Sequence, residues 1–176
     1  MFVGTLEPRK NLLRLLEAYS QLPAPSQGKC HIVIAGGKGW GKIEFQKKME
    51  NWRINDKIHF IDYLDELSLQ YLYSKGRFSV MPSIYEGFGL PISEAMKYGT
   101  PAIAGNNSSM PEVVGPAGLL VDAKDINSIA DALEILINDD VLRNDLSKKA
   151  IKHVKTIATR KSIDALLNVF KNSLKN

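Results

Sequence analysis

The sequence predicts an α/β fold in which a doubly wound, parallel β-sheet carries helices on both faces. Short apolar runs alternate along the chain with segments of helical periodicity, and this order is typical of parallel sheets. The run from His31 to Ala35 shows no polar and apolar alternation, as expected of a strand covered on both faces. A length of 176 residues with 44% hydrophobic residues suffices for one domain with a sizeable core.

The first half of the chain contains three predicted strands, each followed by a helix. Leucines and Tyr19 recur at helical spacing in the first of these helices. The strand that begins at His31 is closed by Gly36 and Gly37. Strands are expected at 1–6, 31–35 and 58–63, and helices at 10–22, 43–52 and 66–74. Because residues 2–4 are already strand-like, the chain is expected to begin inside a folded element, as a partial reading frame would.

The second half continues the alternation and ends in consecutive helices. Pro91 suits a first helical turn, and Gly99 stops the helix that it opens. Strands are expected at 80–82, 101–104 and 119–121, and helices at 91–98, 126–137, 139–154 and 161–174. No internal repeat or linker interrupts the sequence, so residues 1–176 are expected to form one Rossmann-like domain.

Composition excludes several classes of site and partner. The net charge of +4 is too diffuse to identify a binding partner. The lysines at 148, 149, 152 and 155 lack interleaved aromatic residues, which indicates a solvated helix face and no nucleic-acid surface. One cysteine excludes an internal disulfide, and the three histidines lack ligand-like spacing, so no metal or other cofactor is expected. No apolar run approaches the roughly 20 residues of a membrane span, and no signal peptide is visible, which favours the cytoplasm.

The stretch 83–96 carries the strongest chemical signal. It is expected to contain a strand end, a loop with Gly87 and Gly89, and a helix start at Pro91. Glycines let the backbone bend and approach a ligand closely, and the free N–H groups at a helix start favour an anion. The amide groups expected to point at such an anion are those of Phe88, Gly89 and Leu90.

Two carboxylates flank this loop. Glu86 precedes it, and Glu94 lies about one turn into the helix. Carboxylates accept hydrogen bonds from the vicinal hydroxyls of a sugar or a ribose, so the stretch fits a sugar nucleotide. By spacing alone, a plain strand-to-helix connection with an acid that complements the helix dipole is about equally consistent.

Two basic segments follow predicted strand ends, where ligands bind in doubly wound sheets. Arg9 and Lys10 could clamp a diphosphate, with Asn11 helping to open the next helix, although most such pairs are simply solvated. In the glycine-rich segment 36–42, Lys38 could reach the diphosphate or sugar, and a turn with an exposed lysine is at least as consistent.

The sequence Glu86-Gly-Phe-Gly-Leu-Pro-x-x-Glu94-Ala-Met resembles the Glu-x7-Glu signature of retaining glycosyltransferases of family 4, the group 1 glycosyltransferases of GT-B fold. In that family the motif lies in the C-terminal, donor-binding domain. The segment from Gly4 to Asn11 resembles the family's Gly-x4-Arg-Lys-Asn/Gly segment. The resemblance covers nearly the whole chain and implies the C-terminal half of a GT-B fold.

The resemblance also implies roles for individual residues. Lys10, with Arg9, would stabilise the donor diphosphate, and Glu86 would hold the transferred sugar; these three are the predicted catalytic residues. Many relatives carry an arginine where this chain has Thr5. An apolar shelf for the nucleobase would come from Tyr63, Leu64 and Leu67, and Glu94 would hold the ribose, whereas Glu112 would be structural. The predicted donor-binding residues are Thr5, Lys38, Tyr63, Leu64, Leu67, Gly87, Phe88, Gly89, Leu90 and Glu94.

The implied reaction is transfer of a hexose, with retention and without a metal, from a nucleoside diphosphate sugar to a glycan or lipid-linked acceptor. The wording of residues 4–11 resembles mannosyltransferases of surface polysaccharide assembly. The acceptor would require an N-terminal domain that this chain is expected to lack, so donor binding without turnover is expected. Peripheral contact with the inner face of the membrane and self-association through the helix at 161–174 are further expectations. The alternative is a nonenzymatic nucleotide-binding or regulatory domain.

Overall fold

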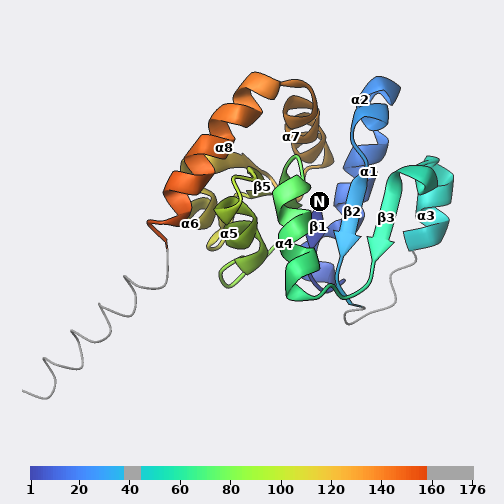
Figure 1. The fold of residues 1–176 in the computed structure, drawn as a ribbon. Helices are drawn as coiled ribbons and strands as arrows, with labels where there is room; N and C mark the ends of the chain where they lie inside the picture. The colour runs from blue at the N-terminus through green and yellow to red at the C-terminus, as the bar shows by residue number, and fades with distance from the viewer. Residues whose placement is uncertain (38–44, 158–176) are drawn as a thin grey trace, which may run out of the picture.

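The computed structural model describes residues 1–37 and 45–157. It contains two three-stranded parallel sheets, with strand orders β1-β2-β3 and β4-β5-β6 (Figure 1). The strands are β1 (Phe2–Val3), β2 (Ile32–Ala35), β3 (Ile58–Ile61), β4 (Ser79–Met81), β5 (Ala102–Gly105) and β6 (Gly118–Val121).

The two sheets adjoin at β1 and β4. The backbone N–H of Val80 donates to the carbonyl oxygen of Met1 at 2.8 Å. Across this contact the strands follow the order β3-β2-β1-β4-β5-β6, which is the order of a doubly wound nucleotide-binding sheet. The direction of winding reverses between β1 and β4, so their carboxyl ends are where this fold places ligands.

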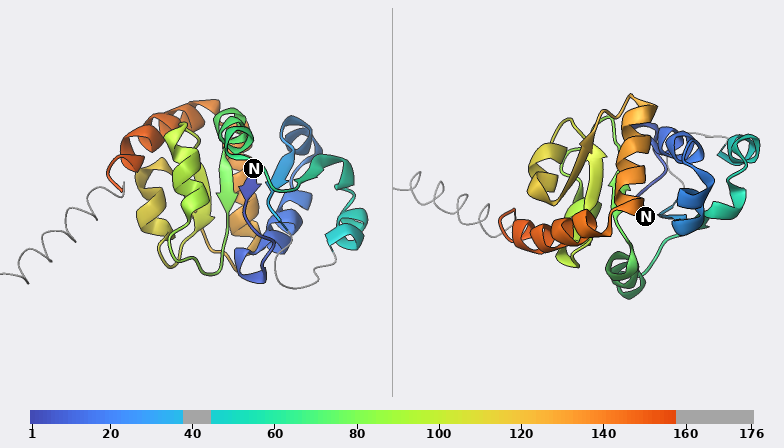
Figure 2. Two further views of the ribbon diagram at one scale, coloured as in Figure 1. Left: turned by 60° about the horizontal axis from the view of Figure 1, so that its bottom comes forward. Right: turned by 90° about the horizontal axis from the view of Figure 1, so that it is seen from above.

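Helices cover both faces of the strands (Figure 2). Side chains on each strand alternate between the two faces: Phe2 packs in a core cluster with α1 and α7, whereas Val3 packs with Tyr73 of α4 and Ala95 of α5. This alternation explains the continuous apolar runs and confirms the predicted fold class. The helices are α1 (Leu12–Ser20), α2 (Ala24–Lys29), α3 (Phe45–Trp52), α4 (Glu66–Lys75), α5 (Leu90–Lys97), α6 (Met110–Val114), α7 (Ile126–Asn138) and α8 (Asp140–Val154).

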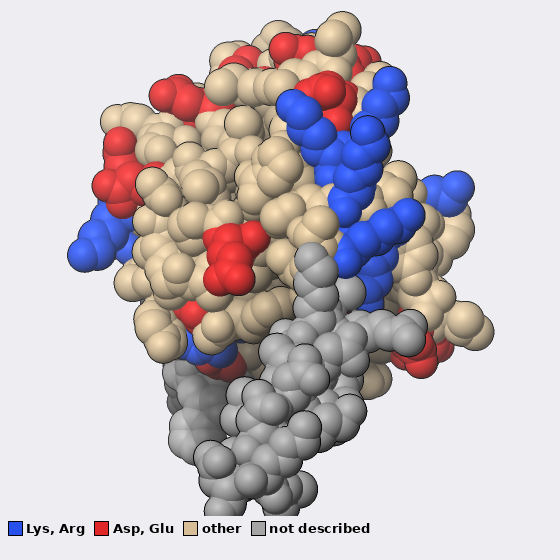
Figure 3. Space-filling view, turned by 90° about the vertical axis from the view of Figure 1, so that its left-hand side faces the viewer, with Lys and Arg blue, Asp and Glu red and all other residues tan. Residues whose placement is uncertain are grey.

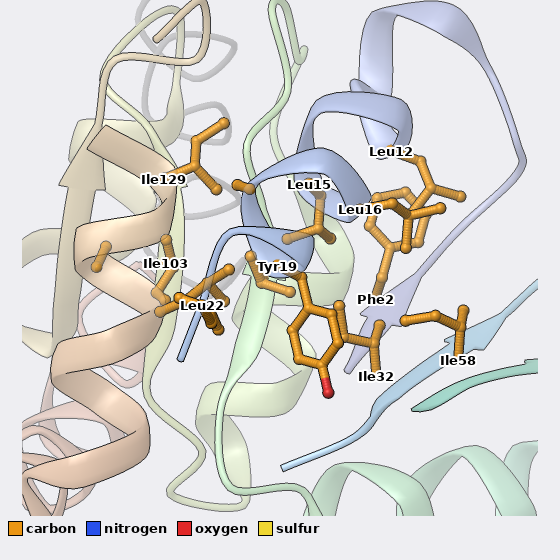
Figure 4. Close-up of a cluster of buried hydrophobic side chains, with 14 of the residues drawn as sticks. Phe2, Leu12, Leu15, Leu16, Tyr19, Leu22, Ile32, Ile58, Ile103 and Ile129 are labelled. Atoms are coloured by element: carbon orange, nitrogen blue, oxygen red, sulfur yellow. The ribbon is translucent and has the colours of Figure 1, made fainter. Parts of the chain in front are cut away.

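The core between α1, α7 and the first sheet anchors the loop that precedes α1 (Figure 4). Leu15 and Leu16 are fully buried there, and burial of such a side chain stabilises the fold by about 1.5–3 kcal/mol. The buried phenol of Tyr19 donates to the carbonyl oxygen of Cys30 at 2.8 Å, which ties the end of α1 to the start of β2. Because α1 is fixed on both sides, residues 8–11 at its start are held against the sheet.

Several predicted boundaries were wrong. Strand β1 ends at Val3 instead of residue 6, because Gly4 adopts a φ of +143° and Pro8–Lys10 forms a 3-10 turn. The helices α2 and α6 were not predicted: α2 contains Pro25 and Gly28 and lacks apolar periodicity, and α6 has only five residues. The predicted helix at 161–174 and residues 43–44 lie outside the described residues.

The lysines of α8 form the expected solvated face, since Lys148, Lys149, Lys152 and Lys155 are all exposed. Figure 3 shows the molecule from the side of α6 and α8, where basic side chains gather on one side of the view with acidic groups close by. Within residues 1–37 and 45–157, no helix is both long and apolar enough to cross a membrane.

Candidate functional site

The carboxyl ends of β1 and β4 bring two distant segments, 4–11 and 82–86, into contact. The N–H of Ile84 donates to the carbonyl oxygen of Arg9 at 2.8 Å. The buried side-chain amide of Asn11 donates to the carbonyl oxygens of Pro82, at 2.9 Å, and Ala123, at 2.6 Å. Asn11 itself has a left-handed backbone, with φ of 61°, and its side chain makes no cap to α1. Asn11 is the N-cap residue of α1, as predicted, and its carbonyl oxygen accepts from the N–H of Leu15 at 3.2 Å, while its side chain ties the two segments together.

The Glu86 carboxylate is the centre of this contact. Glu86 is only 8% exposed; its Oε2 accepts from Arg9 Nη1 at 2.9 Å and its Oε1 from Ser83 Oγ at 3.1 Å. The hydrogen bond to Glu86 is the largest cause that raises the pKa of Arg9. Arg9 also donates to Glu7, whose pKa is lowered first by a hydrogen bond from Thr5 and then by Arg9. Two of the three predicted catalytic residues, Arg9 and Glu86, thus belong to one polar network with Thr5 and Glu7.

Lys10 lies beside this network with its ammonium buried. Its side chain is 10% exposed, and Nζ lies 4.0 Å from Glu86 Oε1. Within the described part of the chain, Nζ has no hydrogen-bond acceptor. It lies over Gly4, where an added Cβ would come within 2.4 Å of it. The ammonium therefore keeps its donors free for an anion, and Gly4 beneath it has a φ of +143°, which favours glycine at that position.

The loop after β5 holds the main chain of Glu86. Ser108 Oγ accepts from the N–H of Glu86 at 3.1 Å, and Ser109 Oγ donates to its carbonyl oxygen at 3.2 Å. Asn107 Nδ2 donates to the carbonyl oxygen of Ser83 at 2.9 Å, so the segment on both sides of the carboxylate is fixed. Sequence reasoning singled out this loop but not these contacts.

The glycine loop leads from Glu86 into α5. Gly89 is the N-cap of α5 with φ of 85°, and a Cβ there would lie 2.1 Å from the methyl group of Met110, so glycine is required. Gly87 has no positive φ and open space around its Cα, so the protein itself does not require glycine at that position. Phe88 and Leu90 are exposed. Among the described residues, the N–H groups of residues 87–90 have no acceptor, which leaves them available to an anion.

An apolar hollow of about 210 Å³ lies at the carboxyl ends of β1, β2 and β3. Tyr63 and Leu64 line it, together with Gly4 and with Thr5 of the polar network. Leu67 is 78% exposed and does not line it; Leu69, which was not predicted, does. The hollow is large enough for an aromatic base and opens directly beside Thr5.

Glu94 lines a smaller hollow of about 150 Å³ between α4 and α5. Its Oε2 accepts a hydrogen bond from the hydroxyl of Tyr73 at 2.9 Å. Leu69 lines both this hollow and the apolar one, so the two adjoin. Tyr73 was missed because a tyrosine inside a helix has the same sequence signal whether it packs in the core or supports a site.

Two predictions about the site, the role of Lys38 and the absence of a metal ion, are not tested by these contacts. Lys38 lies outside the described residues. In residues 1–37 and 45–157, no group of three or more histidine, cysteine, aspartate or glutamate side chains is arranged to hold a metal ion. The expected absence of a metal stays a prediction.

Comparison with known proteins agrees with this architecture. Residues 1–153 match the family described as "Glycosyl transferases group 1". The chain is 34% identical over 171 residues to O-antigen chain mannosyltransferase B of Escherichia coli, which covers 97% of this chain and 45% of that protein. It is 29% identical over 181 residues to D-inositol 3-phosphate glycosyltransferase of Corynebacterium glutamicum, covering 99% of this chain and 43% of the relative.

Solved structures share the fold. Sucrose-phosphate synthase from Thermosynechococcus elongatus superposes with a TM-score of 0.80 at 25% identity, over 98% of this chain and 45% of its own. Anabaena HepE in complex with UDP-glucose gives a TM-score of 0.79 at 19% identity, over 96% and 48% of the two chains. The chain thus spans less than half the length of these relatives and structures.

Proposed function

Because this chain belongs to the group 1 glycosyl transferases, we propose that it is the donor-binding domain of a retaining glycosyltransferase that transfers a hexose from a nucleoside diphosphate sugar. The observation that carries this proposal is the meeting of Lys10 and Glu86 at the switch point between β1 and β4. A buried ammonium, which has no hydrogen-bond acceptor among the residues that the structure describes, lies 4.0 Å from a buried carboxylate there. Their charges match the two halves of a departing sugar nucleotide, an anionic diphosphate and a cationic sugar.

The proposed chemistry is electrostatic. As the bond between the anomeric carbon and the diphosphate breaks, negative charge grows on the leaving oxygen and positive charge on the sugar. Lys10 and the backbone N–H groups of residues 87–90 stabilise the negative charge on the leaving oxygen. Glu86 holds sugar hydroxyls and stabilises the positive charge on the sugar. Arg9 supports the carboxylate, because its guanidinium donates to Glu86 at 2.9 Å, and its positive charge adds to the attraction for the diphosphate. No covalent nucleophile is assigned.

The nucleoside would occupy the two adjoining hollows. The base would lie in the apolar hollow against Tyr63 and Leu64, and Glu94 in the neighbouring hollow would accept hydrogen bonds from the ribose hydroxyls. Leu69 forms the wall that both hollows share. This assignment rests on Thr5, which lines the apolar hollow, and on Leu69, which lines both hollows. It predicts that base and ribose contribute to affinity through different residues.

The whole enzyme would supply the acceptor from a second domain. The relatives, of which this chain covers less than half, include an O-antigen chain mannosyltransferase and a D-inositol 3-phosphate glycosyltransferase. These names support a hexose donor and favour mannose. The acceptor would be a glycan or a lipid-linked sugar, presented on the cytoplasmic side, with the inner face of the membrane as one setting. The chain alone is expected to bind donor without turning it over, and full-rate transfer by this chain would contradict that.

Calorimetric titration of this chain with UDP, GDP and ADP, followed by the sugar nucleotides of the base that binds, tests the proposal. Saturable binding should weaken at least about tenfold in Lys10→Ala, because a charged hydrogen bond to phosphate is lost. Glu86→Gln should reduce only the additional affinity that the sugar confers. A nonenzymatic nucleotide-binding domain would instead bind the nucleotide with no dependence on the sugar, and equal affinities of wild type and Lys10→Ala would refute the diphosphate site.

A further inference from the structure

Tyr73 is a buried phenol that the proposed chemistry leaves without a role. It is 2% exposed, and its hydroxyl donates to Glu94 Oε2 at 2.9 Å. We propose that Tyr73 is a positioning residue that orients Glu94 so that the second carboxylate oxygen, Oε1, accepts a ribose hydroxyl. This inference rests on the proposed function, in which Glu94 binds the ribose.

The packing around the phenol makes it a fixed donor. The hydroxyl of Thr100 donates to the backbone carbonyl of Tyr73 at 2.6 Å, in a buried contact. The rings of Tyr73 and Tyr98 stack with centroids 6.3 Å apart. Ala95, the neighbour of Glu94, packs in the same core cluster as Tyr73 and Val3. The hydroxyl and the start of the Glu94 side chain therefore share one rigid frame that extends to β1.

The chemistry of the pair gives the two oxygens of Glu94 different roles. Burial, and then the neighbouring Glu94 carboxylate, raise the pKa of Tyr73, so the phenol keeps its proton throughout the neutral range. The phenol therefore always donates and occupies Oε2. Oε1 has no partner among the described residues, and Glu94 lines the hollow that adjoins the apolar one. A glutamate has three side-chain torsions, and the fixed donor restricts them before any ligand arrives.

Removal of the hydroxyl has two opposing effects on ribose binding. Glu94 gains rotational freedom, which weakens binding, while its carboxylate loses a competing donor and becomes a stronger acceptor, which tightens binding. We expect the first effect to dominate, because the phenol bonds to Oε2 and not to the oxygen left for the ribose. The competing explanation is that Tyr73 only fills the core, in which case ribose hydroxyls would be irrelevant to its effect.

The test combines variants of this chain with matched ligands. The nucleoside diphosphate that binds in the calorimetric titration is compared with its 2′,3′-dideoxy analogue, which lacks the ribose hydroxyls. Wild type should prefer the hydroxylated ligand by about tenfold, the value of one hydrogen bond to a charged group. Tyr73→Phe should lower that preference to about twofold while binding the dideoxy ligand as wild type does. Tyr73→Phe/Glu94→Gln should show no further loss than Glu94→Gln.

Tyr19→Phe is the matched control. It also removes a buried phenol hydroxyl, one that donates to backbone carbonyls on the other side of the sheet, so it should lower thermal stability and keep the full ligand preference. An equal loss for both ligands in Tyr73→Phe, an unchanged preference or tighter binding of the hydroxylated ligand would overturn the inference. The proposed ribose site would fail as well if wild type showed no preference for the hydroxylated ligand, or if Glu94→Gln kept that preference. Failure of the ribose site is thereby distinguished from failure of the Tyr73 inference alone.

Discussion

The Lys10–Glu86 pair predicts that the two partners have unequal effects on stability. Both side chains are about nine-tenths buried, and Nζ and Oε1 are 4.0 Å apart without a hydrogen bond. Glu86→Gln keeps the shape of the side chain, and its amide can still pair with Ser83 and accept from Arg9. It removes the one carboxylate that lies within 4.0 Å of the buried ammonium of Lys10 among the described residues. Lys10→Met instead removes the buried charge itself and leaves an apolar chain of similar length.

The expected magnitudes follow from this asymmetry. At 4 Å a charge pair gains about 4 kcal/mol at an effective dielectric constant of 20, and desolvation offsets much of that gain. The contact between Glu86 and the 43% exposed Arg9 adds less than about 1 kcal/mol, because solvent screens it. Glu86→Gln should therefore cost about 2 kcal/mol, or roughly 4–8 °C in Tm for a chain of this size. Lys10→Met should change stability by less than about 1 kcal/mol in either direction.

Urea denaturation and thermal melts of the two single variants and Lys10→Met/Glu86→Gln measure these effects without any ligand. The double variant should recover most of the loss caused by Glu86→Gln, because the uncompensated ammonium is gone. If Lys10→Met were as destabilising as Glu86→Gln, the pair would be an ordinary stabilising ion pair. The argument that Lys10 is held ready for an anion, at some expense to stability, would then be refuted.

Three further predictions concern the surrounding frame. Gly89→Ala should destabilise the chain by about 1–3 kcal/mol because of its positive φ, whereas Gly87→Ala should be within about 0.5 kcal/mol of wild type in the same urea titrations. Asn11→Asp should cost about 2–4 kcal/mol, since carboxylate oxygens would face the two carbonyl oxygens that the amide now binds, and a Tm unchanged from wild type would contradict this. Burial raises the pKa values of Tyr19 and Tyr73, so the contribution of these two phenols to stability is complete below about pH 10 and falls as the pH rises further. Urea titrations at pH 8–11.5 should therefore show a smaller alkaline loss of stability in Tyr19→Phe than in wild type.

The sequence was most informative where one local rule determined the structure. The apolar run at 31–35 predicted a strand covered on both faces, and Gly89 and Pro91 predicted the start of α5 to within one residue. Both depend on neighbours along the chain, which a sequence displays directly. Elements stabilised by distant contacts were missed, as α2 shows: its Ser26 donates to Glu134 of α7, a partner more than a hundred residues away.

The same distinction applies to the candidate site. Charged residues at strand ends were identified because the fold class places such ends together, and Arg9, Lys10 and Glu86 do meet. The residues that hold them in place were not identified, since Ser108 and Tyr73 act through hydrogen bonds across the fold and carry no motif of their own. Spacing along the chain predicts which groups could react, and packing decides which groups orient them.

The pairing of Glu86 before any donor arrives bears on how the proposed enzyme would use its binding energy. Both carboxylate oxygens already accept hydrogen bonds, from Arg9 and Ser83, so a sugar hydroxyl would have to replace or share one of them. The net gain in the ground state would be small, because a hydrogen bond from Arg9 or Ser83 to the carboxylate is exchanged for one from a sugar hydroxyl. Once positive charge develops on the sugar, the carboxylate gains an attraction that the ground state lacks. In the proposed mechanism Glu86 would therefore contribute more to the rate of transfer than to donor affinity, as differential binding of the transition state requires. In the two-domain enzyme, Glu86→Gln should accordingly lower kcat far more than it raises KM for the donor.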